Sequence, residues 1–386
     1  MAEHHCGGSQ DSPRPRTSPP SAVTLRLPPT TEPPSDSNPP KQKTWLIFGA
    51  TGHMGRSLVR CCLSHGDRVS AVGWTKEHTL QQMQNAKPGE RNYHGLLCDV
   101  RVRETVDAAV QAAIKHWKAF DIVVNCTGYG VIGACEDQDT HDLRNQFETN
   151  FLGTLNIIQL SLPYFRERAE SLLAAVPEKS KSGSAQVAPF PCRYIIFSST
   201  SGALGVPGLG PYCATKYAVE GLIESMLYEI DSFGIKASLI EPGHVRLDDH
   251  LADGPETQPL FNSPVASSVV PPETDTGLKN SKGLSPGKPR RWQAFLVKPP
   301  SAPYDSPTAP SAHAKRVVQW LNDRQPTSAV KSAELVWQLG HCSYPPLRLL
   351  LGGFAVESVR DRLRCVTEEI EDWKHLNFPI PEDESE

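Results

Sequence analysis

Residues 194–221 read YIIFSSTSGALGVPGLGPYCATKYAVEG. Tyr194 to Phe197 form an apolar run, which is typical of a buried parallel strand, and the turn-forming residues after it end the strand. Pro211 suits the first turn of a helix, and apolar residues recur after it at helical spacing. We therefore predict a strand, a turn and a helix in this stretch.

Three polar side chains converge in this unit. Tyr212 and Lys216 are four residues apart, so both leave the same helix face and point back toward the strand end that carries Ser199. A lysine ammonium near a phenol favours the phenolate and lowers the tyrosine pKa, and a serine hydroxyl can place a substrate oxygen. The set predicts proton transfer to or from a carbonyl oxygen, although a YxxxK spacing alone also arises by chance.

A glycine turn lies near the start of the ordered sequence. TWLIFGATGHMGRSLVRCCLSHG, from Thr44, predicts a strand, a glycine turn and a helix that ends at Gly66, and a second strand follows over residues 68–72. The glycine spacing lets the backbone approach a pyrophosphate that the helix N-terminus holds, although glycines that only pack helix on strand are the alternative. The expected cofactor contacts are Gly49, Thr51, Gly52, Met54 and Gly55.

The end of the second strand bears on the choice of cofactor. The chain there reads AVGWTKEH, with no carboxylate at the strand end itself to bind the ribose hydroxyls of NAD. Thr75 and Lys76 tolerate a 2′-phosphate better than an aspartate would. We therefore expect NADP(H) to be favoured over NAD(H).

Further strands are predicted over residues 93–98, 121–125, 235–240 and 347–351, with helices between them, which gives an α/β fold with a doubly wound parallel sheet. Ligands bind at the carboxyl ends of such strands. The candidate cofactor contacts there are Asp99, Asn125, Gly128, Pro242, Gly243 and Val245. Asp99 could instead cap the helix from Val102, and Asn150, in a predicted helix, could simply bond to nearby backbone.

Composition limits the function. The 386 residues carry a net charge of −4 with an isoelectric point near 6.4, so neither nucleic acid nor an anionic membrane is an expected partner. Ten cysteines occur without a CxxC motif, which indicates reduced intracellular thiols, and no apolar run is long enough for a transmembrane segment. We expect a cytoplasmic protein without a metal site; His4, His5 and Cys6 stand in a polar tail.

The chain divides by composition. Residues 1–42 are rich in Pro and Ser and predict a disordered tail. Residues 43–386 predict a single domain, interrupted by irregular insertions near 170–192 and 255–312 that are dense in Pro, Ser and Gly.

The motifs FGATGHMG, NCTGYGVIGACED, FETNFLG, YCATK and EPG, in this order, resemble the short-chain dehydrogenase/reductase family. GYGVIGACED, QFETNFLGTLN and PPLRLLLG are similar to the subgroup of 17β-hydroxysteroid and retinol dehydrogenases, which includes acyl-dihydroxyacetone-phosphate reductase. The resemblance implies a Rossmann-like sheet of seven parallel strands. It also implies homodimers formed through the helices around Asn150 and Tyr212.

Site roles follow from the resemblance. It implies that Tyr212 is the catalytic acid or base and that Lys216 lowers its pKa and holds the nicotinamide ribose. It implies that Ser199 positions the carbonyl and that Asn150 anchors a water in a proton relay. Asp99 and Asn125 match positions that contact the cofactor.

The sequence departs from the family pattern at three positions. Phe48 replaces a threonine, His53 replaces the middle glycine of the loop, and Leu247 replaces a threonine that meets the nicotinamide. We expect an NADP(H)-preferring oxidoreductase that interconverts a ketone or aldehyde and an alcohol on a moderately apolar small molecule. The alternative is a catalytically weak dinucleotide sensor or scaffold on the same fold.

Overall fold

The structure is a computed structural model. It describes residues 25–74, 80–85, 90–174, 192–243, 245–246, 290–292, 295–310, 312–313 and 327–376. Thr75, Lys76 and Leu247, and most of the two predicted insertions, lie outside the described residues.

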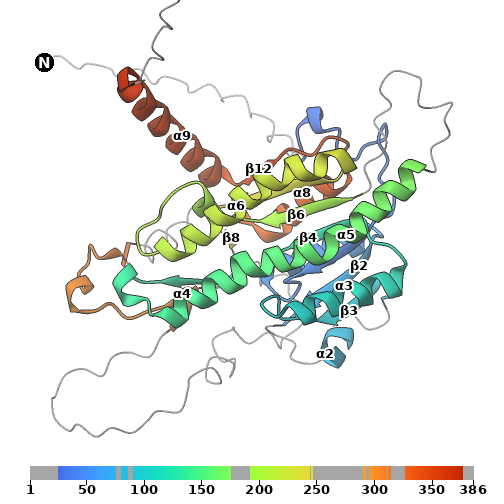
Figure 1. Ribbon diagram of the computed structural model, residues 1–386, viewed down its shortest axis with the longest axis horizontal. Coiled ribbons are helices and arrows are strands. Elements are labelled where there is room, and N and C mark those ends of the chain that lie inside the picture. The colour runs from blue at the N-terminus through green and yellow to red at the C-terminus, as the bar shows by residue number, and fades with distance from the viewer. Residues whose placement is uncertain are drawn as a thin grey trace, which may run out of the picture.

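A parallel sheet of seven strands forms the centre of the molecule (Figure 1). Its interior strands are buried along almost their whole length, because helices cover both faces. The order is β12-β7-β6-β4-β1-β2-β3, as predicted for a doubly wound sheet. The strands are β1 (Thr44–Phe48), β2 (Arg68–Gly73), β3 (Tyr93–Leu97), β4 (Ile122–Asn125), β6 (Arg193–Phe197), β7 (Lys236–Pro242) and β12 (Arg348–Leu351).

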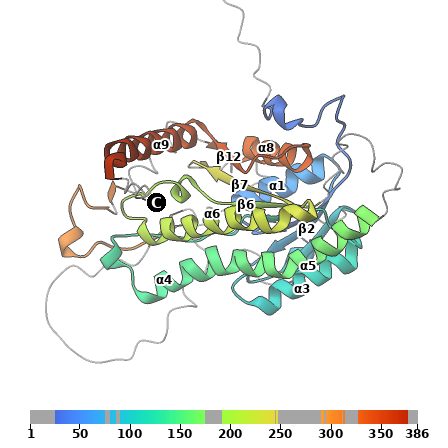
Figure 2. The ribbon, with the colours of Figure 1, turned by 45° about the horizontal axis from the view of Figure 1, so that its top comes forward.

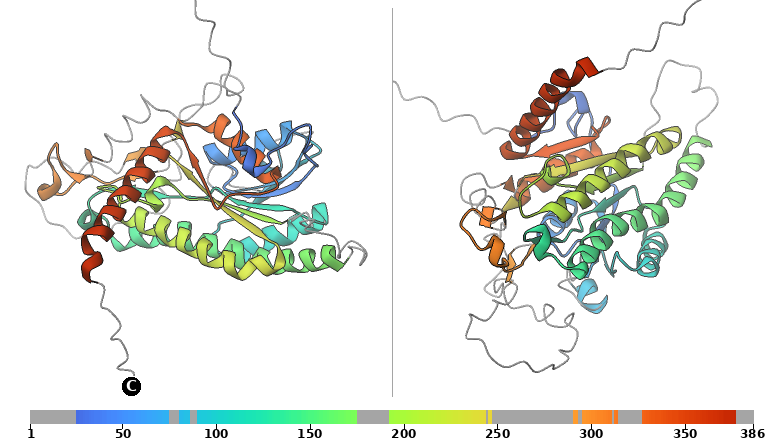
Figure 3. Two further views of the ribbon diagram at one scale, coloured as in Figure 1. Left: turned by 90° about the horizontal axis from the view of Figure 1, so that it is seen from above. Right: turned by 60° about the vertical axis from the view of Figure 1, so that its left-hand side comes forward.

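Helices pack on both faces of the sheet, each through an apolar stripe (Figures 2 and 3). One face carries α3 (Arg103–Trp117), α5 (Gly153–Ala174) and α6 (Gly210–Ile230). The other carries α1 (His53–Ser64) and α8 (Ala329–His341). Two short helices, α2 (Leu80–Asn85) and α4 (Thr140–Phe147), complete this part of the fold.

The region near 255–312 is not wholly irregular. β9 (Arg290–Trp292) and β10 (Phe295–Val297) pair antiparallel, and β10 joins β5 (Gly130–Ile132) in parallel. A second small sheet joins β8 (Val245–Arg246) to β11 (Thr327–Ser328). The prediction of an irregular insertion was therefore wrong over residues 290–292 and 295–297, because pairing with a distant strand orders them.

The expected disorder of residues 1–42 does not extend over residues 25–42, which lie against α8. Leu27 is only 3% exposed, and its backbone N–H donates to Gln338 Oε1 at 3.0 Å. Gln338 Nε2 in turn donates to the carbonyl oxygen of Leu25 at 3.0 Å. One buried leucine and a glutamine that bonds the backbone on both sides hold a segment whose composition is otherwise polar.

The last helix, α9 (Gly353–Trp373), follows β12 and leaves the body of the molecule (Figure 1). Its first turn packs near Gly243, and most of its later residues are exposed. Among the described residues, no helix has the length and apolar character that crossing a membrane would require.

Candidate active site

The carboxyl ends of β1 and β4 form the switch point of the sheet, because the chain runs outward in opposite directions from these neighbours. Gly49 lies there with a φ of +77°, which favours glycine. A Cβ on Gly49 would lie 2.8 Å from the backbone of Cys126, and one on Gly55 would lie 2.2 Å from the carbonyl oxygen of Gly49. These glycines therefore let the loop after β1 fold tightly against the loop after β4 and the start of α1, and we call this loop the glycine cradle.

The N-terminus of α1 faces the same cradle. The helix begins at His53, and the preceding Gly52 supplies no side-chain cap, so the first N–H groups suit a pyrophosphate. Thr51 is buried with its methyl against Gly73, the last residue of β2, and Met54 is buried in the core below. The glycine loop thus fits a dinucleotide, with half-buried His53 at the position where the family pattern has glycine.

Asp99 already has a strong partner. Its Oδ2 lies 2.7 Å from Arg101 Nη2, and its Oδ1 accepts from Arg101 Nε and from the Arg101 backbone N–H, both at 3.0 Å. Asp99 does not act as the cap of α3, which begins at Arg103 and has Val102 at its cap position. An adenine amine would have to share this carboxylate with the Arg101 guanidinium.

Asn125 fixes the end of β4. Its Nδ2 donates to Thr154 Oγ1 at 2.9 Å, and its Oδ1 accepts from the backbone N–H of Thr127 at 2.9 Å. Gly128 follows, with open space at its Cβ position; the nearest atoms are Lys216 Nζ at 3.9 Å and Asn150 Oδ1 at 4.0 Å. The loop after β4 thus runs close to two of the predicted catalytic side chains, Lys216 and Asn150.

Asn150 lies in a π-helical turn, Glu148–Leu152, between α4 and α5. Its Oδ1 accepts from the Tyr129 backbone N–H at 2.9 Å, and its Nδ2 donates to the Tyr129 carbonyl oxygen at 2.8 Å and to Thr215 Oγ1 at 2.9 Å. The amide therefore ties the loop after β4 to α6. Single π turns inside helices are frequent at functional sites.

Lys216 is buried beneath Tyr212 on α6. Its Nζ donates to the carbonyl oxygen of Phe197 at 3.0 Å and lies 5.7 Å from the Tyr212 ring centroid. Burial lowers the pKa of Lys216 to about 8, and the nearby carboxylate of Glu220 opposes this shift. The site thus holds an ammonium group that loses its proton close to neutral pH.

Tyr212 and Ser199 come together as predicted. Burial raises the pKa of Tyr212 to about 12, and a hydrogen bond with Ser199 opposes that shift. The sequence predicted that Lys216 lowers this pKa, whereas burial of the phenol raises it. Ser199 also caps the short turn after β6, accepting from the Ser201 backbone N–H at 3.2 Å.

The segment after β7 closes the site on one side. Pro242 ends the strand, the Gly243 backbone N–H donates to the Leu351 carbonyl oxygen at 3.0 Å, and Val245 is buried in β8. A Cβ on Gly243 would lie 3.4 Å from Phe354 Cδ1. These three residues line up with the end of the sheet where Ser199 and Tyr212 lie.

One wall of the site was missed from the sequence. The Phe295 ring, from β10, lies edge-on to Tyr212 with 5.2 Å between the ring centroids. A Cβ on Gly130 would lie 2.5 Å from Phe295 and 2.9 Å from the Tyr212 ring, so glycine is required there. A run of apolar residues, FLV at 295–297, was the only signal, and it lies in a region whose composition predicted no order.

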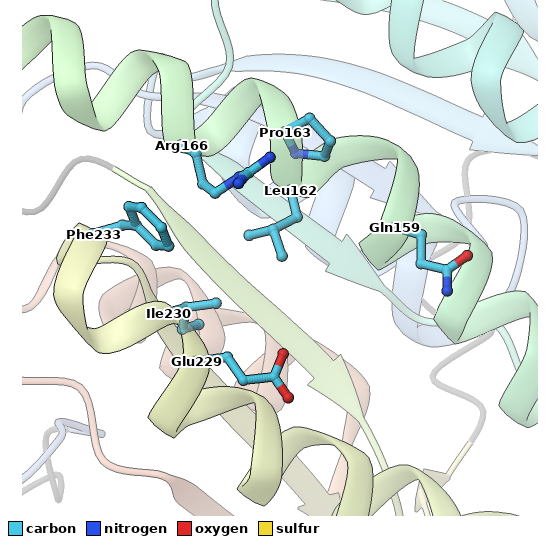
Figure 4. A pocket seen from close by; sticks show the side chains of 7 residues that line it. All are labelled: Gln159, Leu162, Pro163, Arg166, Glu229, Ile230 and Phe233. Carbon is cyan, nitrogen blue, oxygen red and sulfur yellow. The ribbon is translucent and has the colours of Figure 1, made fainter.

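A hollow of about 330 Å³ lies between α5 and α6 (Figure 4). The Arg166 guanidinium lies over the Phe233 ring at one end of it, 5.8 Å from the ring centroid. The hollow is lined by Gln159, Leu162, Pro163, Arg166, Glu229, Ile230 and Phe233. Tyr212 is about 27 Å away along α6, so this hollow is not part of the active site.

Two helices are joined by a polar cluster on the other face. Glu334 Oε2, on α8, lies 3.0 Å from His65 Nε2 and 3.5 Å from Cys61 Sγ, and its Oε1 accepts from Gln338. The three groups that could ligate a metal lie within 4.8 Å of one another. Both carboxylate oxygens already have partners in the protein, so the cluster serves as a clamp between α1 and α8.

The sheet order defines a doubly wound α/β protein, and the glycine cradle lies at the switch point, where proteins of this class bind their ligands. A profile of the short chain dehydrogenase family matches residues 43–254. The chain therefore belongs to the short-chain dehydrogenase/reductase family, whose members are oxidoreductases that use nicotinamide dinucleotides.

Individual relatives agree with this assignment. The chain is 26% identical over 336 residues to the oxidoreductase BOA17 of Botryotinia fuckeliana, covering 87% of this chain and 98% of that protein. It is 32% identical over 200 residues to the 3-ketodihydrosphingosine reductase of Bacteroides thetaiotaomicron, covering 51% and 62%. A short-chain dehydrogenase structure from Streptomyces avermitilis has the same fold, with a TM-score of 0.64, 24% identity, and coverage of 89% and 98%.

Proposed function

We propose that the protein is an NADP(H)-preferring reductase or dehydrogenase that interconverts a carbonyl group and an alcohol. The observation that carries the proposal is the Tyr212 hydroxyl, hydrogen-bonded by Ser199 and backed by buried Lys216, at the edge of the sheet where the glycine cradle opens. A binding module has no need of all three groups.

The residues divide the work on the proton and the oxygen. A bound nicotinamide supplies or accepts the hydride. Tyr212 gives the carbonyl oxygen its proton in reduction and takes it back in oxidation, and its raised pKa keeps the phenol protonated at neutral pH. Ser199 holds the oxygen, and the charge of Lys216 stabilises the phenolate that remains.

Asn150 acts here by holding the backbone of Tyr129 in place. Its side-chain amide is bonded on both sides of Tyr129 and to Thr215, so it sets the distance between the loop after β4 and the catalytic helix. The water relay implied by the family resemblance adds a second task for the same amide.

Cofactor preference follows from charge. β2 ends at Gly73 and Trp74 follows it, so neither position carries a carboxylate to bind a ribose diol. A 2′-phosphate therefore meets no repulsion from those residues, which supports NADP(H).

The substrate side is apolar. Phe295, Leu209 and Val206 form part of one small apolar cluster with Tyr212. A moderately apolar ketone or alcohol suits this wall, and the relative named as a 3-ketodihydrosphingosine reductase acts, by its name, on a ketone.

The test is oxidation of NADPH and of NADH by the purified full-length chain with aliphatic, aromatic, steroid and quinone carbonyls. Tyr212→Phe is expected to lower turnover at least about a hundredfold, because the proton donor is lost, while NADPH binding stays within about twofold of wild type. Tyr217→Phe, on an exposed tyrosine of the same helix, is the matched control and should keep full turnover.

Near-normal turnover by Tyr212→Phe would refute the role of Tyr212. Tight NADPH binding without turnover on any carbonyl would instead favour a sensor or scaffold. If the wild-type protein does not bind NADPH at all, His53 in the glycine cradle blocks the cofactor.

A further inference from the structure

The helix α9 carries an apolar stripe that the described part of the chain leaves partly exposed. Leu363 is 62% exposed, Ile370 is 61% exposed and Trp373 is 63% exposed. Their spacing, with Val356, Val359 and Val366, alternates between three and four residues, which is the heptad pattern of a coiled coil. We call these six residues the α9 seam.

Charges lie unevenly along α9. Residues 357–364 carry three basic and two acidic side chains, and residues 368–372 carry four acidic ones: Glu368, Glu369, Glu371 and Asp372. Most of these groups pair within the helix: Arg360 with Glu357 at 3.0 Å, Arg364 with Asp361 at 2.7 Å and Lys374 with Glu371 at 2.6 Å. The helix itself therefore satisfies most of its outward-facing charges.

Arg362 and Glu369 are different. Both are exposed and flank the α9 seam at the same heptad position, one heptad apart, and neither forms an ion pair within the described part of the chain. In an antiparallel pair of helices, residues at this position face each other across the seam. Arg362 of one copy would then meet Glu369 of the other, and symmetry would make this contact twice.

We propose that α9 is a self-association surface that pairs antiparallel with α9 of a second copy of this chain. Leu363 of one copy lies opposite Val366 of the other, Val359 opposite Ile370, and Val356 opposite Trp373. Burial of the seam drives the association, and the two Arg362–Glu369 pairs, together with opposed helix dipoles, select the antiparallel direction.

The observations favour a second copy over a lipid surface. Between Glu357 and Lys374, α9 carries six acidic and four basic side chains, so anionic headgroups would repel it. Residues 360–364 and 367–376 are also exposed. At 1.5 Å per residue α9 is about 31 Å long, enough for three heptads of contact.

Sedimentation velocity of the full-length chain at several concentrations tests this. Leu363→Glu with Ile370→Glu is expected to halve the sedimenting mass, because two charges enter the seam. Arg364→Glu changes the net charge by the same amount on the outer face of α9 and should leave the mass unchanged. Circular dichroism of each variant shows whether α9 stays helical.

A charge exchange tests the direction. Arg362→Glu alone and Glu369→Arg alone should each weaken association, and the double exchange should restore it. A parallel pair would place residue 369 opposite Lys374, so the double variant would stay weak.

Three results would overturn the proposal. The first is a wild-type protein that stays monomeric at all concentrations. The second is a sedimenting mass that Leu363→Glu with Ile370→Glu leaves unchanged. The third is a wild-type monomer that binds phosphatidylcholine vesicles through the α9 seam. None of these measurements depends on turnover, so they separate this proposal from the proposed activity.

Discussion

Glu241, at the end of β7, is a fully buried carboxylate in a crowded acidic site. Arg348 Nε lies 2.9 Å from its Oε1, and the same guanidinium also pairs with Glu220 and Glu224 of α6. Burial raises the pKa of Glu241 to about 7, with Glu220 adding to the shift and Arg348 opposing it. One arginine thus serves three carboxylates.

This carboxyl group makes stability depend on pH. The unfolded chain releases the Glu241 proton near pH 4.5 and the folded chain near pH 7, so the free energy of unfolding falls as pH rises between these values. Glu241→Gln removes this loss. We expect its free energy of unfolding, relative to wild type, to increase by up to about 3 kcal/mol between pH 4.5 and pH 7.5, measured by urea denaturation.

The Gln side chain is nearly the same size, which makes this variant its own packing control. A difference between variant and wild type that stays constant over this pH range would contradict the raised pKa.

Tyr212 shows what residue spacing can and cannot predict. The i, i+4 spacing from Lys216 and the position of Ser199 at a strand end were enough to bring the three groups together. The direction of the tyrosine pKa was wrong, because it depends on how completely the phenol is buried, and Phe295, 83 residues away in sequence, is the side chain packed edge-on to its ring.

At the scale of elements, β10 forms the wall that carries Phe295. Phe295→Ala is expected to raise KM for a bulky apolar ketone about tenfold, because the ring that lines the site beside Tyr212 is lost. Phe295→Leu keeps an apolar side chain of similar reach and should stay close to wild type. Steady-state kinetics on a substrate found in the NADPH screen measures both.

An unchanged KM in the alanine variant would mean that substrate lies elsewhere. A fall in kcat alone would instead assign Phe295 to the positioning of Tyr212.

The segment at residues 25–42 is a second structural element that composition hid. Leu27→Ala is expected to cost about 2–4 kcal/mol of the free energy of unfolding, because it leaves a cavity against α8. Leu25→Ala, on a neighbouring exposed leucine, is the matched control and should change stability by less than about 0.5 kcal/mol. Urea denaturation measures both variants. If Leu27→Ala costs as little stability as Leu25→Ala, the segment does not stabilise the domain.

Strand positions were predicted to within about two residues, and unpredicted order arose where partners are distant. β1, β4 and β6 are apolar runs whose burial on both faces makes their pattern local and readable. The order of residues 25–42 depends on Gln338, and that of β10 on pairing with β5. A single sequence does not show such contacts, because they join segments that no local pattern links.

At the scale of the whole molecule, the single domain predicted to begin at residue 43 stays a prediction. In the structure, the segment at residues 25–42 also packs with it. The sheet, both helical layers and the segment at 25–42 form one packed unit, whereas α9 stands apart from it (Figure 2). Dimerisation through α5 and α6, implied by the family resemblance, also stays a prediction. Four large apolar side chains are exposed near these helices. Tyr217 and Tyr228 lie on α6, and Phe147 and Leu152 lie shortly before α5.

Asp67, near the amino end of the sheet, forms hydrogen bonds that join distant parts of the chain. Its Oδ2 accepts from the indole N–H of Trp45 and of Trp337, both at 2.9 Å, and lies 2.8 Å from His341 Nε2. Trp337 is 270 residues beyond Asp67. A ribosome adds about 5–20 residues per second, so about 15–50 s pass between the synthesis of Asp67 and that of Trp337. The apolar faces of β1 and α1 stay uncovered for that time, so a nascent chain of this protein needs a chaperone most before α8 emerges.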